Sequence, residues 1–414
     1  LYIFLIKVSS SESLKSKKGK KITMANIKIP ITKPTLPKFD SLKEEVREIL
    51  ESGMLTNYKH VREFESMLKA KLNVKNVVAL SSCTSGLMLC MKAWGLTGEV
   101  ILPSFTFSAT GHAIKWNNLT PVFVEVDPIT QTIDPAAVEA AITDKTSAIL
   151  GVHLYGCPAK IKELEAIAKK HNLKLIFDAA HAMGSTYDGK AIGNFGDAEV
   201  FSCSPTKLLV TTEGGIVCTN DDELAKTLRY ARNYGDPGDY NCKLTGINAR
   251  MTEFNAIVGK HSLAMLNNNV LTRNRLVQIY KELLQSIPGI TYQTVPDNCV
   301  SSFKDFALFI NSEIFGCNRD ILISELLELG IQSKPYFYPP LHEQDAYQEY
   351  SQIYQGKLDL TEKVSRETIS LPLYSHMPTE EIIQVVAAVK QIHHKYKQSP
   401  NHQEINDQKV NGIE

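Results

Sequence analysis

The sequence predicts an α/β protein: a large, mostly parallel seven-stranded sheet domain with helices on both faces, followed by a smaller α+β domain. Two observations predict this. Short apolar runs alternate with segments of helical period through most of the chain, which is typical of strand–helix–strand units. From about residue 263 the pattern changes to a long helix, one strong strand and further helices. A chain of 414 residues is long enough for a large domain and a smaller one.

The large domain begins with a strand over 77–80, a turn of small polar residues and a helix over 87–94. Short apolar runs of strand length follow it. They cover residues 99–102, 121–126, 147–152, 174–177 and 198–201. Helices such as 161–170 fill the gaps, and 215–219 is predicted to turn back as the seventh strand. Such an alternation places a parallel sheet between two layers of helices.

The second domain is predicted to contain a strand over 303–310, a helix over 319–329 and a closing helix over 380–397. The predicted domain limits are therefore 24–262 and 263–398. Residues 1–6 are apolar, but this run is too short for the core of a signal peptide, and the lysines follow it. We expect residues 1–23 to be disordered or an artefact of start-site choice, and 399–414 to be a polar tail.

Charge and cysteine content restrict the class of partner. Lys plus Arg total 45 and Asp plus Glu total 45, so no bulk field attracts nucleic acid or anionic lipid. We expect a small-molecule substrate and neither a nucleic-acid nor a membrane partner. The eight cysteines are scattered without a Cys-x-x-Cys pair, which predicts no metal site and a reducing, cytoplasmic location.

The turns at the carboxyl ends of the strands are where an open α/β sheet binds its ligand. The first of them, Ser82-Cys83-Thr84-Ser85-Gly86, opens a helix, so its N–H groups and hydroxyls favour a phosphate. Serine and threonine at a helix start also act as simple N-caps, and this alternative stays open.

A second turn carries Asp178 after the apolar strand, with His181 three residues later on a starting helix. At this spacing the two side chains face the same way. The aspartate could keep a ring nitrogen protonated while the imidazole bonds a phenolic oxygen. The alternative is an aspartate that caps its helix beside a satisfied histidine.

The third turn carries Lys207 in a Ser/Thr-rich segment before Gly214 and Gly215. A lysine amine has a pKa near 10.4 and is a poor nucleophile until burial lowers this value. A solvated surface lysine is the alternative. A buried lysine opposite Asp178 is what an enzyme needs to hold pyridoxal phosphate (PLP) as a Schiff base, with a carboxylate on its pyridinium nitrogen.

The order and the residues of these segments resemble those of the DegT/DnrJ/EryC1/StrS family of PLP-dependent sugar aminotransferases, which have fold type I. The resemblance runs from about residue 29 to residue 393. It rests on residues 64–65, 82–86, 103–107, 153–156, 177–182, 202–207 with 213–215, 246–251, 339–342 and 371–373.

The resemblance implies that Lys207 holds PLP as a Schiff base and later moves the proton, that Asp178 pairs with the pyridine nitrogen, and that His181 bonds the phenolic oxygen. It further implies roles for seven residues outside this trio. Thr84, Ser85 and Ser202 would hold the phosphate, Phe107 would stack on the ring, Asn248 of the neighbouring subunit would complete the phosphate cup, and Arg250 and His342 are substrate candidates.

The implied reaction transfers an amino group from L-glutamate or a similar donor to a nucleotide-linked keto-deoxysugar, for cell-surface glycan or secondary-metabolite sugar biosynthesis. A homodimer with a shared active site is implied as well. Cys203, Ser204 and Thr212 depart from the common family pattern and take no assigned role.

Other functions stay open at this point. An aminotransferase acting on a keto-cyclitol or aminoshikimate-type substrate would keep the same cofactor residues, and a PLP-dependent sugar dehydratase is a further alternative, although the presence of Lys207 favours transamination. A PLP-fold binding or regulatory protein is the non-enzyme alternative. A nicotinamide dehydrogenase is disfavoured because no Gly-x-Gly-x-x-Gly follows the first strand.

Overall fold

A computed structural model describes residues 27–398, so the predictions for 1–23 and 399–414 lie outside the described part. Its central sheet has seven strands in the order β1-β9-β8-β5-β4-β2-β3. They are β1 (Asn76–Leu80), β2 (Glu99–Pro103), β3 (Thr120–Val124), β4 (Thr146–Val152), β5 (Lys174–Asp178), β8 (Ala198–Ser202) and β9 (Gly215–Thr219). Only β9 runs antiparallel to its neighbours β1 and β8. The predicted mostly parallel sheet is confirmed, including the strand that turns back.

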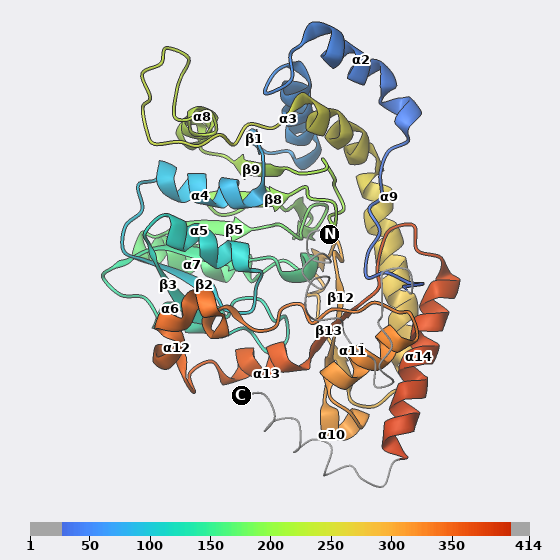
Figure 1. Ribbon diagram of the computed structural model, residues 1–414. Helices are drawn as coiled ribbons and strands as arrows, with labels where there is room; N and C mark the ends of the chain where they lie inside the picture. Colours follow the sequence, from blue (N-terminus) through green and yellow to red (C-terminus); the bar gives the residue numbers. More distant parts are fainter. Residues whose placement is uncertain (1–26, 399–414) are drawn as a thin grey trace.

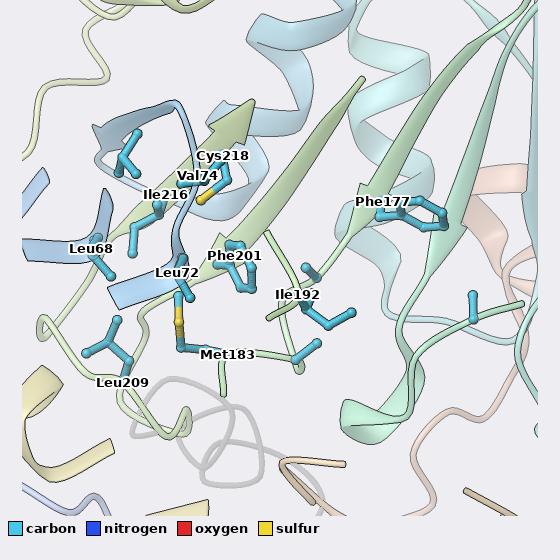
Figure 2. Close-up of a cluster of buried hydrophobic side chains, with 14 of the residues drawn as sticks. Leu68, Leu72, Val74, Phe177, Met183, Ile192, Phe201, Leu209, Ile216 and Cys218 are labelled. Carbon is cyan, nitrogen blue, oxygen red and sulfur yellow. The ribbon is translucent and has the colours of Figure 1, made fainter. Parts of the chain in front are cut away.

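Helices cover both faces of this sheet (Figure 1). One face packs against α4 (Cys83–Ala93), α5 (Ser108–Trp116) and α8 (Asp222–Ala231), and the other against α3 (Lys59–Leu72), α6 (Pro135–Ala140), α7 (Ile161–His171) and the first half of α9 (Glu253–Leu284). Figure 2 shows part of the second interface, where Leu68 and Leu72 of α3 meet Phe201 and Ile216 of the sheet. Burial of these apolar side chains holds the layers together and leaves the strand ends for polar chemistry.

The smaller domain is built on the second half of α9. Its antiparallel sheet contains β10 (Ile290–Tyr292), β12 (Phe306–Ile310) and β13 (Thr368–Leu371), and α11 (Arg319–Glu328) and α14 (Thr379–Lys397) complete its core. The long helix predicted from about residue 263 begins at Glu253, because the Thr252 hydroxyl caps it by accepting from the Asn255 N–H. The predicted limit at residue 262 therefore falls inside one continuous helix.

The strand predicted from residue 303 begins at Phe306 instead. The residues before it follow a different path, because the Lys304 N–H donates to the Tyr155 carbonyl at 2.9 Å. This path brings the start of β12 to the large domain.

The remaining α-helices and strands are short. They are α2 (Lys43–Ser52), β6 (Thr186–Tyr187), β7 (Lys190–Ala191), β11 (Cys299–Val300), α10 (Ser312–Phe315), α12 (Gln348–Tyr354) and α13 (Asp359–Glu367). The small sheet β11-β6-β7 pairs the segment before β12 with a hairpin of the large domain. In the described part of the chain, no helix has the length and apolar character needed to cross a membrane.

Candidate active site

The predicted phosphate turn forms the N-cap and the first turn of α4, just after β1. The Ser82 hydroxyl caps α4 by accepting from the Ser85 N–H at 3.1 Å, and the Ser85 hydroxyl donates to the Ser82 carbonyl at 2.8 Å. No acidic side chain occupies the first turn of α4. The positive end of the helix dipole is therefore not neutralised by the chain itself, which suits an anion.

A glycine brings this turn against the end of β8. Gly215 pairs with Leu80 of β1 on one side and with Ser202 of β8 on the other. A Cβ atom at Gly215 would lie 2.2 Å from the Ser82 carbonyl oxygen, so only glycine permits this approach. The turn that holds Thr84 and Ser85 thus lies one strand away from Ser202, as a shared phosphate site requires.

Asp178 ends β5 and is 5% exposed. Its Oδ2 accepts from the Thr110 hydroxyl at 2.8 Å, and its Oδ1 accepts from the Ala180 N–H at 3.0 Å. Burial raises the pKa of Asp178, and the hydrogen bonds from Thr110 and Ala180 and the charge of Lys207 oppose this rise. The carboxylate is thus held in place by neutral donors and retains its attraction for a cation.

His181 is buried beside Asp178 and has a fixed proton position. Its Nδ1 accepts from the Tyr155 N–H at 3.1 Å, so the neutral ring carries its proton on Nε2. Burial lowers the pKa of His181 well below the ordinary range, and the charges of Lys207 and Lys304 lower it further. A neutral imidazole with Nε2–H outward is a hydrogen-bond donor suited to a phenolic oxygen.

Lys207 follows β8 in a turn where its N–H donates to the Ser204 carbonyl at 3.0 Å. Burial lowers the pKa of Lys207 to about 8, with a further lowering by Lys304, while Asp305, Cys83 and Asp178 act in the opposite direction. A larger share of this amine is neutral near physiological pH than of an exposed lysine. The structure therefore brings a nucleophilic amine into the same charged cluster as Asp178 and His181.

Phe107 stands at the start of α5 and is 46% exposed. Its ring centre is 6.1 Å from that of Phe337, which comes from the smaller domain. Phe337 in turn stacks on His181 at 5.9 Å with an angle of 10° between the rings. The three rings thus form a row that ends on His181, and the stacking role of Phe107 stays a prediction.

Asn248 and Arg250 lie on a segment that touches the phosphate turn, where the Ser81 N–H donates to the Ala249 carbonyl at 2.8 Å. The Asn248 side chain is exposed on the single chain. Arg250 donates to the Asn233 side chain and lies 5.4 Å from the Tyr234 ring, and its buried Nε has no hydrogen-bond partner among the described residues. Arg250 is thus braced within the chain with one donor left over.

His342, the second substrate candidate, is 3% exposed. Its Nδ1 lies 2.7 Å from the Ser104 hydroxyl and its Nε2 lies 3.5 Å from Glu362. The first contact ties the 339–342 segment to the loop before α5, and the second brings it beside α13. The structure places the His342 ring in a bracing position, and its role toward a substrate stays a prediction.

Three residues near this cluster were missed by sequence reasoning. Thr110 orients Asp178, and Lys304 and Asp305 influence Lys207 from the smaller domain. Thr110 is separated from Asp178 by 68 residues, so no local pattern joins them. The sequence does contain one signal for Lys304 and Asp305. They stand directly before the apolar run 306–310, and charged side chains at the start of a buried strand are costly unless they have a structural or functional role.

The described residues fit PLP. The buried Asp178 carboxylate suits a protonated ring nitrogen, the His181 Nε2–H suits a phenolic oxygen, and the first turn of α4 with no acidic side chain suits a phosphate. The Lys207 amine, with its lowered pKa, suits a carbonyl carbon. Each part of the cofactor therefore meets a group of complementary chemistry.

Comparisons with known proteins agree with this fit. A sequence model of the DegT/DnrJ/EryC1/StrS aminotransferase family matches residues 39–390. The chain is 35% identical over 351 residues to dTDP-3-amino-3,6-dideoxy-alpha-D-galactopyranose transaminase of Aneurinibacillus thermoaerophilus, covering 84% of this chain and 94% of the relative. It is 32% identical over 372 residues to GDP-perosamine synthase of Caulobacter vibrioides, covering 88% and 99%. The solved structure of DesI in the presence of its TDP-sugar product matches with a TM-score of 0.83 and 35% identity, covering 88% of this chain and 93% of that one.

The match covers the sheet domain and most of the smaller domain, so it includes every residue of the charged cluster. The expected fold type I, the PLP cofactor and the transaminase class are confirmed. This chain belongs to the DegT/DnrJ/EryC1/StrS aminotransferase family, whose enzymes use pyridoxal 5'-phosphate.

Proposed function

We propose that this chain transfers the amino group of L-glutamate to the keto group of a nucleotide-linked deoxysugar, for cell-surface glycan or secondary-metabolite sugar biosynthesis. The observation that carries the proposal is the amine of Lys207, with a pKa of about 8, in one cluster with buried Asp178 and buried His181. The names of two relatives, which act on a dTDP-linked and a GDP-linked sugar, support the substrate class.

When bound, PLP supplies an electron-withdrawing ring that stabilises negative charge on the carbon next to the transferred nitrogen. Asp178 keeps a proton on the ring nitrogen through its negative charge, and Thr110 keeps its carboxylate oriented. His181 would donate a hydrogen bond from its Nε2–H to the phenolic oxygen. Residues of the first turn of α4, with Ser202, hold the phosphate, and Phe107 covers one face of the ring.

Lys207 has two tasks at one atom. Its Nζ, when neutral, would hold the cofactor at its carbonyl carbon with loss of water, and once the donor amine has replaced it the same Nζ would accept a proton from carbon and return it at a neighbouring position. The pKa of about 8 suits both tasks, because proton transfer is most efficient when the pKa lies near the working pH.

We also propose a homodimer in which Asn248 of each chain completes the phosphate site of the other. Support comes from the exposed Asn248 side chain and from exposed aromatic residues nearby on the same segments, such as Tyr234 and Tyr240, which are 51% and 96% exposed. Arg250 and His342 are the proposed contacts of the sugar nucleotide. The eight cysteines are free thiols, which supports a cytoplasmic location.

The first experiment is the visible absorbance spectrum of the purified protein with PLP, before and after L-glutamate. We expect a cofactor band that disappears with L-glutamate and returns when a nucleotide-linked keto-deoxysugar is added. Glutarate, which has both carboxylates but no amine, is the control and leaves the band in place. A band that ignores L-glutamate contradicts the proposed donor, and return of the band only with keto-cyclitols contradicts the proposed acceptor.

The shared site is tested by mixing two inactive variants. Lys207→Ala and Asn248→Ala chains, unfolded and refolded together, form mixed dimers in which one site has both native residues. We expect the mixture to regain transaminase activity that neither variant shows alone. If the mixture stays as inactive as its parts, Asn248 does not act across a subunit boundary.

A further inference from the structure

Lys304 and Asp305 form a buried ion pair that the proposed reaction does not yet use. Their side chains are 7% and 6% exposed, and Lys304 Nζ lies 2.8 Å from one carboxylate oxygen of Asp305 and 3.0 Å from the other. Burying two charges is expensive, and replacing such a pair by apolar residues is often neutral or stabilising. Stability alone therefore does not account for the pair.

The pair is anchored beside the predicted cofactor residues. The Lys304 N–H donates to the Tyr155 carbonyl at 2.9 Å, and the N–H of the same tyrosine donates to His181 Nδ1 at 3.1 Å. Arg273 fixes the other side by donating to the Lys304 carbonyl at 2.9 Å. Lys304 Nζ also lies 5.3 Å from the centre of the Tyr336 ring. Lys304 is thus held in place and is linked to His181 through a single residue, Tyr155.

The ion pair lies beside the predicted cofactor residues. The Tyr336 ring, 5.3 Å from Lys304 Nζ, is next to the Phe337 ring that stacks on His181. Lys304 lowers the pKa of Lys207 and of His181, and its effect on Lys207 exceeds the opposing effect of Asp305. The net influence of the pair on Lys207 is therefore that of a positive charge.

The local charges are unbalanced. Asp305 faces two buried cations, Lys304 and Arg273, and the second has no carboxylate within ion-pair distance among the described residues. An ammonium has three N–H donors, and the two oxygens of Asp305 occupy two of those of Lys304. One N–H of Lys304 is left without an acceptor from Asp305, and the group of three side chains has one excess positive charge. Both features favour the binding of an anion.

We propose that Lys304 binds the α-carboxylate of the amino donor beside Lys207, with Asp305 holding Lys304 in place. This rests on the proposed function, because it names the residue that recognises the donor of that reaction. In an α-amino acid the carboxylate and the amine share one carbon, so a cation next to Lys207 reaches the carboxylate while the amine is at the reacting carbon. A buried hydrogen bond between two charged groups is among the strongest available to the site.

The test uses the holoenzyme with Lys304→Met, Asp305→Asn, the double variant and a matched control, Lys281→Met. Lys281 lies in the same domain over the rings of Tyr292 and Phe303, apart from the charged cluster. Glutarate binding is measured by calorimetry, and the L-glutamate dependence of the absorbance change is measured by stopped flow. Thermal melts show that each variant is folded.

We expect Lys304→Met and the double variant to weaken glutarate binding and to raise the half-saturating L-glutamate concentration by about 10- to 100-fold, as for a lost hydrogen bond to a charged group. Asp305→Asn keeps the ammonium of Lys304, so its glutarate affinity falls several-fold less than that of Lys304→Met. Lys281→Met binds glutarate as tightly as the wild type. The PLP affinity stays unchanged in Lys304→Met.

Two results overturn the proposal. Equal losses in Lys304→Met and Asp305→Asn show that the pair only maintains the fold. Weaker PLP affinity with unchanged glutarate binding assigns Lys304 to an oxygen of the cofactor. Failure of the wild type to respond to L-glutamate contradicts the proposed function alone, because the glutarate comparison between wild type and Lys304→Met still decides the role of Lys304.

Discussion

Two buried carboxylates, Glu253 at the start of α9 and Asp178 at the end of β5, are satisfied in different ways. Glu253 is fully buried and accepts from three backbone N–H groups, those of Tyr58 and His60 at 2.7 Å and of Val61 at 3.2 Å. Asp178 accepts from one hydroxyl, one N–H and, at 3.8 Å, the weakly donating thiol of Cys83, and it lies in the electrostatic field of the Lys207 amine.

The difference separates a structural charge from a functional one. The oxygens of Glu253 are used to join the start of α3 to α9, so the carboxylate stabilises the contact between these helices. Burial of Asp178 without full compensation raises its pKa and costs stability, which is tolerated where a ligand supplies the missing cation. The completeness of the hydrogen-bond shell thus distinguishes the two regions.

Lys207→Ala is expected to have the largest effect on the Asp178 region. Without the amine, the rate of amino transfer should fall by about 1,000-fold or more, because the nucleophile and the proton carrier are lost together. Borohydride reduction followed by peptide mass spectrometry should find the cofactor on Lys207 of the wild type and no label on the variant. Normal amino transfer by a folded variant would contradict the role assigned to Lys207.

Asp178→Asn and Glu253→Gln should have opposite patterns. Asp178→Asn lowers turnover by about 100-fold or more, since an electrostatic partner of the ring is lost, and leaves the stability of the apoprotein equal or slightly higher. Glu253→Gln lowers the free energy of unfolding by about 2 to 3 kcal/mol, because the amide cannot accept from all three N–H groups. Denaturant titration of the apoproteins and steady-state rates separate the two patterns. If both variants lose stability equally, the comparison fails.

Thr110→Val tests whether the hydroxyl shell of Asp178 matters. Valine keeps the shape, so the fold should persist, while the lost hydrogen bond raises the pKa of Asp178 and lowers turnover by about 10-fold. The ratio of rates at pH 8 and pH 6 should rise in this variant, because Asp178 holds its proton to a higher pH. Thr106→Val, one step further from the carboxylate, is the matched control and should lose less. Equal losses of turnover in the two variants would show that the Thr110 hydroxyl has no special effect on Asp178.

The smallest effect is a pH dependence of PLP uptake by the apoprotein. Lys207 has a pKa of about 8 when folded and near 10.4 when unfolded, so the folded amine becomes neutral first. The rate of PLP uptake should rise with pH and level off above about 8, the pKa of Lys207. Between these two pKa values the unfolded chain binds more protons, so the contribution of Lys207 to stability increases with pH in that window. Stopped-flow absorbance measures the uptake rate, and a midpoint near pH 10 would show an ordinary exposed lysine.

Much of the fold followed from local patterns. The seven strands were predicted within two residues at each end, because apolar runs of strand length between polar turns are a local property. The chain order of phosphate turn, Asp178, His181 and Lys207 was likewise readable, because each stands next to a predicted strand end. The start of α9 was misjudged by ten residues, since it is set by the capping hydroxyl of Thr252 and not by a change of the apolar pattern.

The sequence by itself determined the alternation of strands and helices, the turn chemistry and, through a dense set of motifs, the family. Only the tertiary structure decided which side chains meet. Strand order places Thr110 on Asp178, Gly215 allows Ser82 and Ser202 to be neighbours, and the path of residues 303–305 carries Lys304 to the large domain. The physical reason is that periodicity and capping depend on neighbours in the chain, whereas burial, charge balance and pKa depend on groups that are distant in sequence and adjacent in space.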